Sequence, residues 1–344
     1  MAKEFALPEG LTYVGPNDYR SNSPLAGLPA VMVGERDVVF DSHRKAAVAP
    51  ANVKKVGSTP DLLGGRQTAK IRYDWPVFRE TVTTRGMTGG LMPADALTMQ
   101  MRIARGVERM LVSAWTTGLI TWEDGSQIDI WTAEGATPYM TVSNAWTTQA
   151  GDPLADVLAA GDTMTQRGAR PAKRLFLGSS AAAAFLANEK VQKILDVQRI
   201  EAGNLAPRRA PGVLPIAMPA VYADAVRGGS QILAQETYTP DMGSFAFIGT
   251  LAGIEIYRDC VGVLPAKEGI LISRAGLMAG GLDADFWLGV GYPWVCGEQI
   301  RVDGGEVAIY KSQSPDGAQL DSYSFISLQW ANVYGALHLR GLVP

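Results

Sequence analysis

The chain has 344 residues, of which 47% are hydrophobic and 19% are charged, and its formal net charge is −3. This length permits one large domain or two ordinary domains with a sizeable core. The near balance of charge argues against a protein built mainly to hold nucleic acid, because such proteins usually carry a basic excess, but it permits passive contact with DNA.

The cysteine content and the apolar segments indicate a protein made in the cytoplasm. Cys260 and Cys296 have no CxxC neighbour and cannot form a disulfide framework, so we expect two buried, reduced thiols. Residues 1–15 lack the apolar region of a signal peptide. No apolar run approaches the roughly 20 residues that a membrane span needs, so we expect no membrane partner.

Residues 1–50 have too little periodic apolar surface for a core of their own. Prolines and glycines interrupt them throughout, and the apolar clusters Ala30–Val33 and 38–40 are short. These clusters favour an arm that lies on another surface over a disordered segment.

Residues 66–85 predict a ribbon of two strands. Apolar residues alternate with Lys70, Arg72 and Asp74 from residue 69 to residue 77, which is the period of a strand with one apolar face. Residues 80–84 form a second β-rich segment, and glycine-rich stretches flank the pair. A two-stranded ribbon is marginally stable alone, so we expect it to pack on a neighbouring subunit.

Residues 93–117 predict one long amphipathic helix. The apolar residues recur at steps of three and four and share a face: Met99, Ile103, Val107, Met110, Leu111 and Ala114. The charged residues Arg102, Arg105, Glu108 and Arg109 lie off that face. Pro93 suits the first turn, and Gly106 is the internal weak point. Strands around an Asp-Gly turn are expected at 120–131.

The middle of the chain predicts a helix, a buried strand and a second helix. Asp152 caps the first helix with Pro153 at its first position, and Gly168 ends it; its apolar stripe is Leu154, Val157 and Leu158. Residues 173–177 form the strand, and residues 178–180 turn the chain into a helix at 181–201.

The remaining segments are β-prone and rich in turns. A proline-rich loop at 203–219 carries Arg208 and Arg209, and strands are expected at 231–234, 245–248 and 254–258. We interpret glycine-rich 275–286 as a flexible loop, and the tail from residue 300 alternates again. Since helices do not alternate regularly with strands, the class is α+β with mixed sheets.

Metal, nucleotide and catalytic motifs are weak. The two histidines, His43 and His338, lack HxxxH or HExxH spacing, and residues 57–66 lack the ending of a phosphate-binding P-loop. Asp283 and Asp285 could chelate a cation, but no third ligand is identifiable and solvated acids are the default. We therefore expect no cofactor, no metal site and no cofactor-binding residue.

One segment resembles a hydrolase motif. A strand, then Gly178, Ser180 and Ala182, then a helix is similar to the nucleophile elbow, with alanine where the second glycine belongs and His338 as the required base. Ser180 as an ordinary helix cap explains the same residues. The pair Arg208 and Arg209 could contact phosphate or an acidic neighbour, although a solvated loop tip is the default. We expect no catalytic residue and a protein that is not an enzyme.

Four segments in succession resemble the lambda-like major head protein family of tailed phages, which has the Hong Kong 97-like fold. They are the helix and strand ARGVERMLVSAWTTGLITWEDG at 104–125, the strand, turn and helix KRLFLGSSAAAAFLANEKVQKILDVQR at 173–199, the strand GTLAGIEIYR at 249–258, and GYPWV at 291–295 with the β-rich tail. Together they span residues 90–344, and the first ninety residues match in architecture alone.

The resemblance implies a division of the chain into five parts. These would be an N-terminal arm (1–50), an extended loop with a two-stranded ribbon (51–90), a peripheral domain with the long spine helix (91–149), an axial domain (150–290), and a return to the peripheral domain with C-terminal strands (291–344). Lys54, Lys55 and Lys70 lie in the loop region, but nothing identifies a cross-linking acceptor.

The resemblance also implies a major capsid protein that self-assembles as hexamers and pentamers into the icosahedral head shell of a tailed bacteriophage. The shell would enclose double-stranded DNA, contact it non-specifically, and form part of the virion after assembly in the host cytoplasm. Because the chain starts almost directly with its arm, we expect a separate scaffold protein, together with a portal; a decoration protein is a further partner of some relatives. The alternatives are an encapsulin-like cellular compartment shell and a serine hydrolase.

Overall fold

The structure is a computed structural model. It describes residues 3–4, 28, 30–33, 38–43, 68–73, 77–83, 93–122, 125–193, 231–232, 244–278, 281–291, 294–295, 298–301, 308–314 and 317–344. It confirms the α+β class with mixed sheets, because parallel and antiparallel strands share the larger sheets and the helices are few and unevenly spaced among the described elements.

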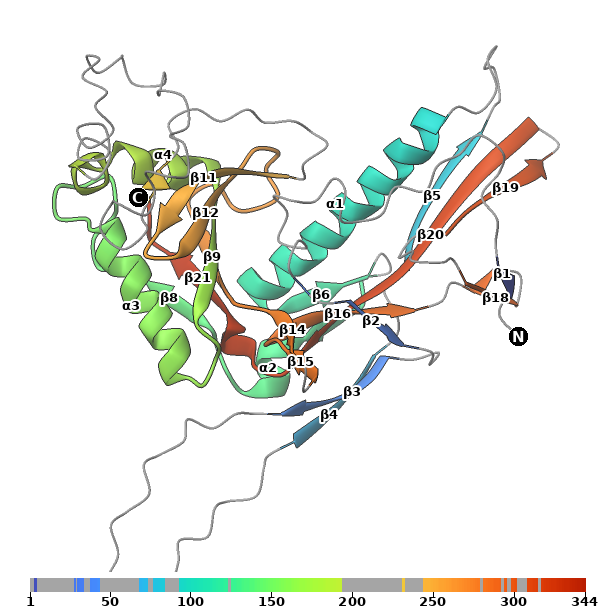
Figure 1. The fold of residues 1–344 in the computed structure, drawn as a ribbon, viewed down its shortest axis with the longest axis horizontal. Coiled ribbons are helices and arrows are strands. Elements are labelled where there is room, and N and C mark those ends of the chain that lie inside the picture. Colours follow the sequence, from blue (N-terminus) through green and yellow to red (C-terminus); the bar gives the residue numbers. More distant parts are fainter. Residues whose placement is uncertain are drawn as a thin grey trace, which may run out of the picture.

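A seven-stranded mixed sheet organises one half of the molecule (Figure 1). Its strands, in spatial order, are β10 (Gln231–Ile232), β11 (Phe245–Leu251), β12 (Ile254–Asp259), β9 (Ala172–Leu177), β13 (Gly269–Ser273), β21 (Ala336–Arg340) and β8 (Tyr139–Thr141). The pairs β12–β9 and β21–β8 are parallel, and the other pairs are antiparallel.

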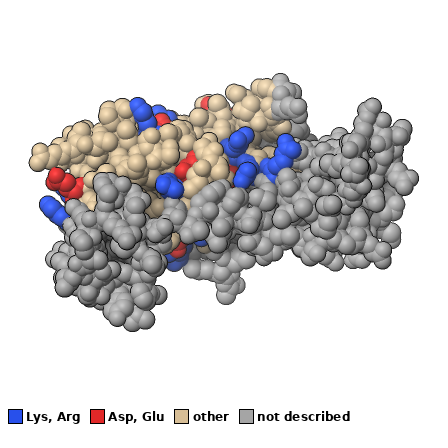
Figure 2. Space-filling view, turned by 90° about the horizontal axis from the view of Figure 1, so that it is seen from above, with Lys and Arg blue, Asp and Glu red and all other residues tan. Residues whose placement is uncertain are grey.

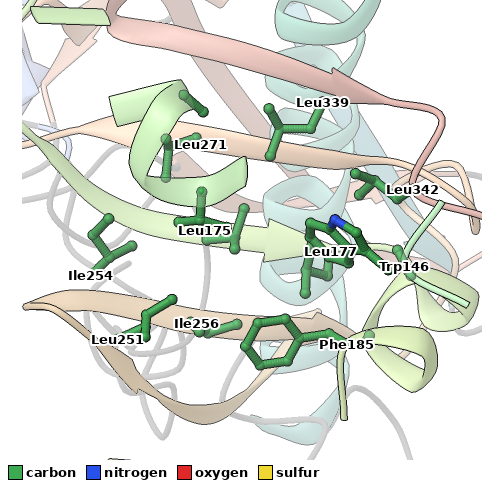
Figure 3. Packing of buried hydrophobic residues seen from close by; sticks show 14 of the residues in the cluster. Trp146, Leu175, Leu177, Phe185, Leu251, Ile254, Ile256, Leu271, Leu339 and Leu342 are labelled. Carbon is green, nitrogen blue, oxygen red and sulfur yellow. The ribbon is translucent and has the colours of Figure 1, made fainter. Parts of the chain in front are cut away.

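The strands of this sheet alternate their side chains between its two faces, and helices pack on the apolar side chains of both faces. Leu175 and Leu177 of β9 point into a cluster with Leu271 and with the helices α3 (Pro153–Gln166) and α4 (Ser179–Ala187); Figure 3 shows these leucines with Trp146 and Phe185 at one end. Phe176, between the two leucines, points to the opposite cluster, which contains the helix α1 (Pro93–Thr117).

A second sheet forms the other half and is built around the long strand β20 (Gly317–Trp330). β20 pairs antiparallel with β19 (Ala308–Ser314), β16 (Phe286–Gly291) and β5 (Val77–Thr83), and β2 (Ala30–Val33) joins β16 in parallel. Smaller sheets pair β3 (Val38–His43) with β4 (Thr68–Tyr73), β6 (Leu119–Thr121) with β7 (Gln127–Asp129), and β14 (Gly276–Met278) with β15 (Gly281–Asp283). The short strands β1 (Lys3–Glu4), β18 (Glu298–Arg301) and β17 (Trp294–Val295) form a further sheet.

The predicted long helix is confirmed at 93–117 as α1, which runs beside β5 and β20 (Figure 1). Ile103, Val107, Leu111 and Ala114 are buried as expected. Gly106 has a packing reason: a Cβ there would lie 3.0 Å from the Phe78 ring of β5. Glu108, which lies off the apolar stripe, is nevertheless buried: its carboxylate is 1% exposed and accepts a hydrogen bond from the Ser244 hydroxyl.

Three predictions about strands and turns need correction. The segments at 69–77 and 80–84 are strands but do not form a ribbon with each other, since β4 pairs with β3 and β5 pairs with β20. Glycine-rich 275–286 is not a loop, because it forms the β14–β15 hairpin and leads into β16. The strand expected to reach residue 131 ends at Asp129, whose side chain caps the short helix α2 (Ile130–Glu134).

Two predictions about helices also need correction. Asp152 caps α3 with Pro153 at its start, as expected, but Leu158 is 47% exposed and the buried face carries Val157, Ala160 and Met164. The helix predicted at 181–201 begins at Ser179 and is interrupted at Asn188, whose backbone is extended. Helical backbone resumes at 189–193, and residues 194–201 lie outside the described residues.

Candidate functional site

A buried ion pair joins the two large sheets. Asp285, which is 0% exposed and precedes β16, accepts hydrogen bonds from the Arg170 side chain at Nη1 and from the Arg170 backbone N–H, each at 2.7 Å. Arg170 lies between α3 and β9, so the pair connects the seven-stranded sheet to the β20 sheet. Asp285 was expected to be a solvated surface acid or half of a cation site, and both interpretations are wrong for this side chain.

The segment between β20 and β21 also bonds to both sides of the contact between the two large sheets, which is called the joint below. The backbone carbonyl of Asp285 accepts the N–H of Ala331 at 2.8 Å, and Asn332 donates from Nδ2 to the Arg167 carbonyl at 3.2 Å. Gly335 lies so close that a Cβ there would be 2.2 Å from the Cβ of Asp285. The joint is therefore tightly packed, and we expect it to hold the two sheets in a fixed relative position.

A second set of buried polar contacts ties helices to these sheets. Glu134 at the end of α2 accepts the indole N–H of Trp330 at 3.0 Å, and both residues are almost fully buried. Glu108 of α1 accepts from Ser244 just before β11. Because a buried carboxylate without a partner is costly, each pair fixes one arrangement of its two elements.

His338 takes part in a third link, between the seven-stranded sheet and the end of α1. Arg340 Nε donates to His338 Nδ1 at 3.1 Å, so the ring proton lies on Nε2 and is donated to Glu268 at 2.8 Å. Arg340 also donates to the Thr116 carbonyl at 3.4 Å and lies over the Tyr139 ring at 4.5 Å. Burial lowers the pKa of His338, and the charge of Arg340 acts in the same direction, while Glu268 opposes both.

The contacts of His338 and Ser180 do not form a catalytic pair. The two ring nitrogens of His338 are engaged by Glu268 and Arg340, and Ser180 is exposed at the start of α4. Ser180 is also not the helix cap that was expected, because Gly178 holds that position. The carbonyl of Ala266 accepts the N–H groups of Ser180 and Ala181 at 2.9 Å each, so a loop caps this helix.

The other candidate residues lie outside the described residues or are described at the backbone alone. Arg208, Arg209, Lys54, Lys55 and Cys296 lie outside the described residues, and for His43, Lys70 and Asp283 the backbone alone is described. Cys260 is half-buried rather than fully buried, and its thiol donates to the Arg258 carbonyl at 3.6 Å. Within the described part of the chain, no three His, Cys, Asp or Glu side chains are placed to hold a metal ion, and no helix is long and apolar enough to span a membrane.

Among the described residues, a separate strand pair and a charged helix face suggest contacts with other molecules. β3 and β4 hydrogen-bond to each other and to no other described strand, and in Figure 1 they lie on the side of β16 and β2 away from α1. On α1, Arg102 and Arg109 are exposed and Arg105 is half-buried. The sequence indicated the strand character of 69–77 and placed these arginines off the apolar stripe, but it did not indicate the β3–β4 pairing or the buried pairs at Asp285, Glu134 and Glu108.

Comparison with known proteins finds a match to one viral family model. Residues 75–245, from near the start of β5 to the first residue of β11, match the family model described as Phage major capsid protein E. The search of curated proteins finds no significant relative.

Several solved shell proteins share a weak likeness with the chain. A virus-like particle from Pyrococcus furiosus is 10% identical with a TM-score of 0.49, covering 93% of each chain. A putative prophage capsid protein of E. coli CFT073 is 10% identical with a TM-score of 0.48, covering 95% of this chain and 93% of that one. The SrpI encapsulin of Synechococcus elongatus is 12% identical with a TM-score of 0.44, covering 91% and 84%. With TM-scores below 0.5, these likenesses do not separate one class of shell protein from another.

Proposed function

We propose that this chain, a phage major capsid protein, assembles with copies of itself into the icosahedral head shell of a tailed bacteriophage. The observation that carries the proposal is the family match over residues 75–245, which includes α1, α3, β9 and α4. The protein is then a component of the virion, and its role is structural rather than enzymatic. We further assign it the Hong Kong 97-like fold, on the order of its arm, extended strand pair, long helix and mixed sheet.

The proposed division of labour partly follows the two halves of the structure. Most of the seven-stranded sheet, with α3 and α4, falls in the proposed axial domain (150–290), but β8 and β21 of that sheet lie outside this range. The helix α1 and the strands β19 and β20 fall in the proposed peripheral domain (91–149 and 291–344), while β16, which pairs with β20, falls almost wholly in the axial range. The arm (1–50) and extended loop (51–90) reach neighbouring copies. The arm does not act through neighbours alone, since β2 pairs with β16 of its own chain.

The strand pair β3–β4 supports contact between subunits. A two-stranded sheet is marginally stable in water unless it packs on other structure. β3 and β4 hydrogen-bond to no other described strand, although β3 approaches β20 of its own chain, and a neighbouring copy would supply further covering surface. Repeated contacts of this kind close a shell when the subunits obey point-group symmetry. Scaffold and portal proteins, and assembly in the host cytoplasm, belong to the same proposal, and packaged DNA would meet the inner surface.

Electron microscopy of the purified full-length chain tests the proposal. Closed icosahedral particles or rings of subunits support it, and a chain that stays monomeric at high concentration contradicts it. A variant in which Asn-Gly replaces residues 44–67 is the sharper test: His43 and Thr68 are paired in register, so a two-residue turn can join them. This variant should fold as a monomer but fail to form normal shells.

Two alternative functions have their own tests. An encapsulin-like compartment would be encoded beside a cargo enzyme, without portal or terminase genes nearby. A serine hydrolase would react with a fluorophosphonate probe through Ser180, so labelling that is unchanged in Ser180→Ala removes that alternative.

A further inference from the structure

We propose that His338, Arg340 and Glu268 form a proton-sensitive latch, called here the histidine latch. It holds the last turn of α1 against the seven-stranded sheet while the His338 ring is neutral, and it releases that turn when the ring binds a second proton. The inference goes beyond the proposed function and does not rest on it, because every contact of the latch lies within one chain.

One guanidinium group links the three elements of the latch. Arg340 of β21 donates from Nε to His338 Nδ1 at 3.1 Å and from Nη2 to the Thr116 carbonyl at 3.4 Å. That carbonyl is among the last four of α1, which have no hydrogen-bond donor within the helix. Arg340 also lies over the Tyr139 ring of β8, with 4.5 Å between the guanidinium carbon and the ring centre. Arg340 therefore ties the end of α1 to two strands of the sheet.

The hydrogen bonds of the latch require a neutral ring. A guanidinium group can only donate, so His338 Nδ1 must present a lone pair to Arg340. The ring proton then lies on Nε2, where Glu268 accepts it at 2.8 Å. A second proton can bind only at Nδ1, where it would point at the N–H of Arg340. Arg340 would lose its acceptor on the ring and would meet a positive charge at hydrogen-bond distance.

The groups around His338 act in opposite directions on its charge. Burial lowers the pKa of the ring and Arg340 acts in the same direction, whereas Glu268 and the Thr116 carbonyl favour the charged form. Ile270 of β13, which is paired with His338 across the sheet, is apolar. His338 is 2% exposed and Arg340 is half-buried, so Arg340 is the partner that can turn toward solvent when the ring becomes charged.

These neighbouring groups, rather than a surface charge of one sign, decide the titration of the ring. Figure 2 shows basic and acidic side chains together on the described part of one face of the molecule. Exposed charges of mixed sign are screened by salt and leave little net potential at a distance. Changes at the residues in contact with the ring should therefore move the titration of His338 most.

Two measurements on the unassembled full-length chain test the latch between about pH 8 and pH 5, the range in which histidine ordinarily titrates. The chain has only two histidines, His43 and His338, so comparison with His43→Gln assigns the His338 signal in NMR spectra. Amide hydrogen exchange then reports the protection of residues 113–118. As His338 becomes charged, this protection should fall roughly tenfold or more, the effect of losing one hydrogen bond to a charged group, while α4 keeps its protection.

Three variants separate a latch from a merely structural contact. His338→Asn keeps an oxygen that can accept from Arg340 but cannot take up the proton, so protection at 113–118 should not depend on pH. Arg340→Gln removes the link, so protection should be low at every pH. Glu268→Gln removes the negative charge that favours the charged ring, so the midpoint should move to lower pH. Lys267→Gln is the matched control, because this exposed side chain bonds to the Pro344 carbonyl and should leave the midpoint unchanged.

The comparison within the wild-type chain decides the proposal even if a substitution prevents folding. Protection at 113–118 that stays constant while His338 titrates would overturn the latch, and so would a ring that remains neutral down to about pH 5. An acid-induced loss of protection that persists with the same midpoint in His338→Asn would also overturn it, because another group would then be responsible.

Discussion

Arg170→Met tests the joint between the two sheets, because it removes one partner of a buried ion pair and leaves the other in place. The Asp285 side chain is 0% exposed and the Arg170 side chain is 13% exposed. Methionine keeps much of the arginine stem, so the main loss is the charge and its hydrogen bond at 2.7 Å. Asp285 would retain the backbone N–H of residue 170 as a donor. Stranding a buried carboxylate in this way should lower the free energy of unfolding by roughly 3–5 kcal/mol.

Urea unfolding of the unassembled chain, followed by tryptophan fluorescence, measures this effect through the midpoint and slope of the transition. Lys173→Met is the matched control, because the Lys173 side chain is 44% exposed and its ion pair with Glu255 lies at the surface. That substitution should cost no more than about 1 kcal/mol.

The double variant Arg170→Met/Asp285→Asn separates charge from packing. A neutral amide removes the stranded charge, so the double variant should be more stable than Arg170→Met alone. The reasoning is refuted if Arg170→Met costs no more than Lys173→Met, or if neutralising Asp285 gives no recovery.

Three further predictions concern stability and assembly. Because the pKa of His338 is lowered in the fold, the neutral ring contributes stability above about pH 6.5, and this contribution is lost as the pH falls below that value. The variant His338→Gln should therefore show a weaker pH dependence of stability in urea melts. An unchanged pH dependence would contradict a neutral His338 in the folded chain. Gly178→Ala places a Cβ 2.1 Å from the Pro265 carbonyl oxygen and should lower the free energy of unfolding by at least about 1–3 kcal/mol. Gly161→Ala, whose Cβ would lie 3.6 Å from its nearest neighbour, should leave the stability unchanged or raise it. Equal unfolding midpoints for the two variants would contradict this packing. Deleting residues 1–40 should prevent particle formation while α3, β9 and α4 stay folded by limited proteolysis, and normal shells from the truncated chain would show that the arm is dispensable.

The elements that local sequence patterns predicted well are those whose signals lie within the element. Pro93 marks the first turn of α1, and the apolar spacing carries the helix to residue 117. Asp152 caps α3 because its side chain and the helix N-terminus are adjacent in the chain. The alternation at 69–77 identified strand character for the same reason.

Strand partners could not be predicted, because pairing depends on residues far apart in the sequence. Thr81 of β5 lies opposite Asp321 of β20, whereas the sequence predicted that this strand pairs with the nearer segment at 69–77. Glycines misled the loop prediction at 275–286, because Gly276 and Gly281 are the first residues of the strands β14 and β15. In the following strand, a Cβ at Gly289 would lie 2.5 Å from the side chains of Ser327 and Gln329, so glycine there permits close strand packing.

The buried ion pair was missed for a similar reason. Asp285 stands among glycines near a second acid, which is the usual pattern of a solvated loop. Its partner Arg170 is 115 positions away, and no local periodicity links the two. The buried position of Glu108 was hidden in the same way, because Ser244 lies 136 positions along the chain.

A reconstruction of the assembled particle by electron cryomicroscopy tests the central claim most directly. The account predicts a closed shell in which β3 and β4 of each subunit lie against a neighbouring copy. Subunits that form no closed lattice, or particles in which β3 and β4 contact nothing beyond their own chain, would contradict it.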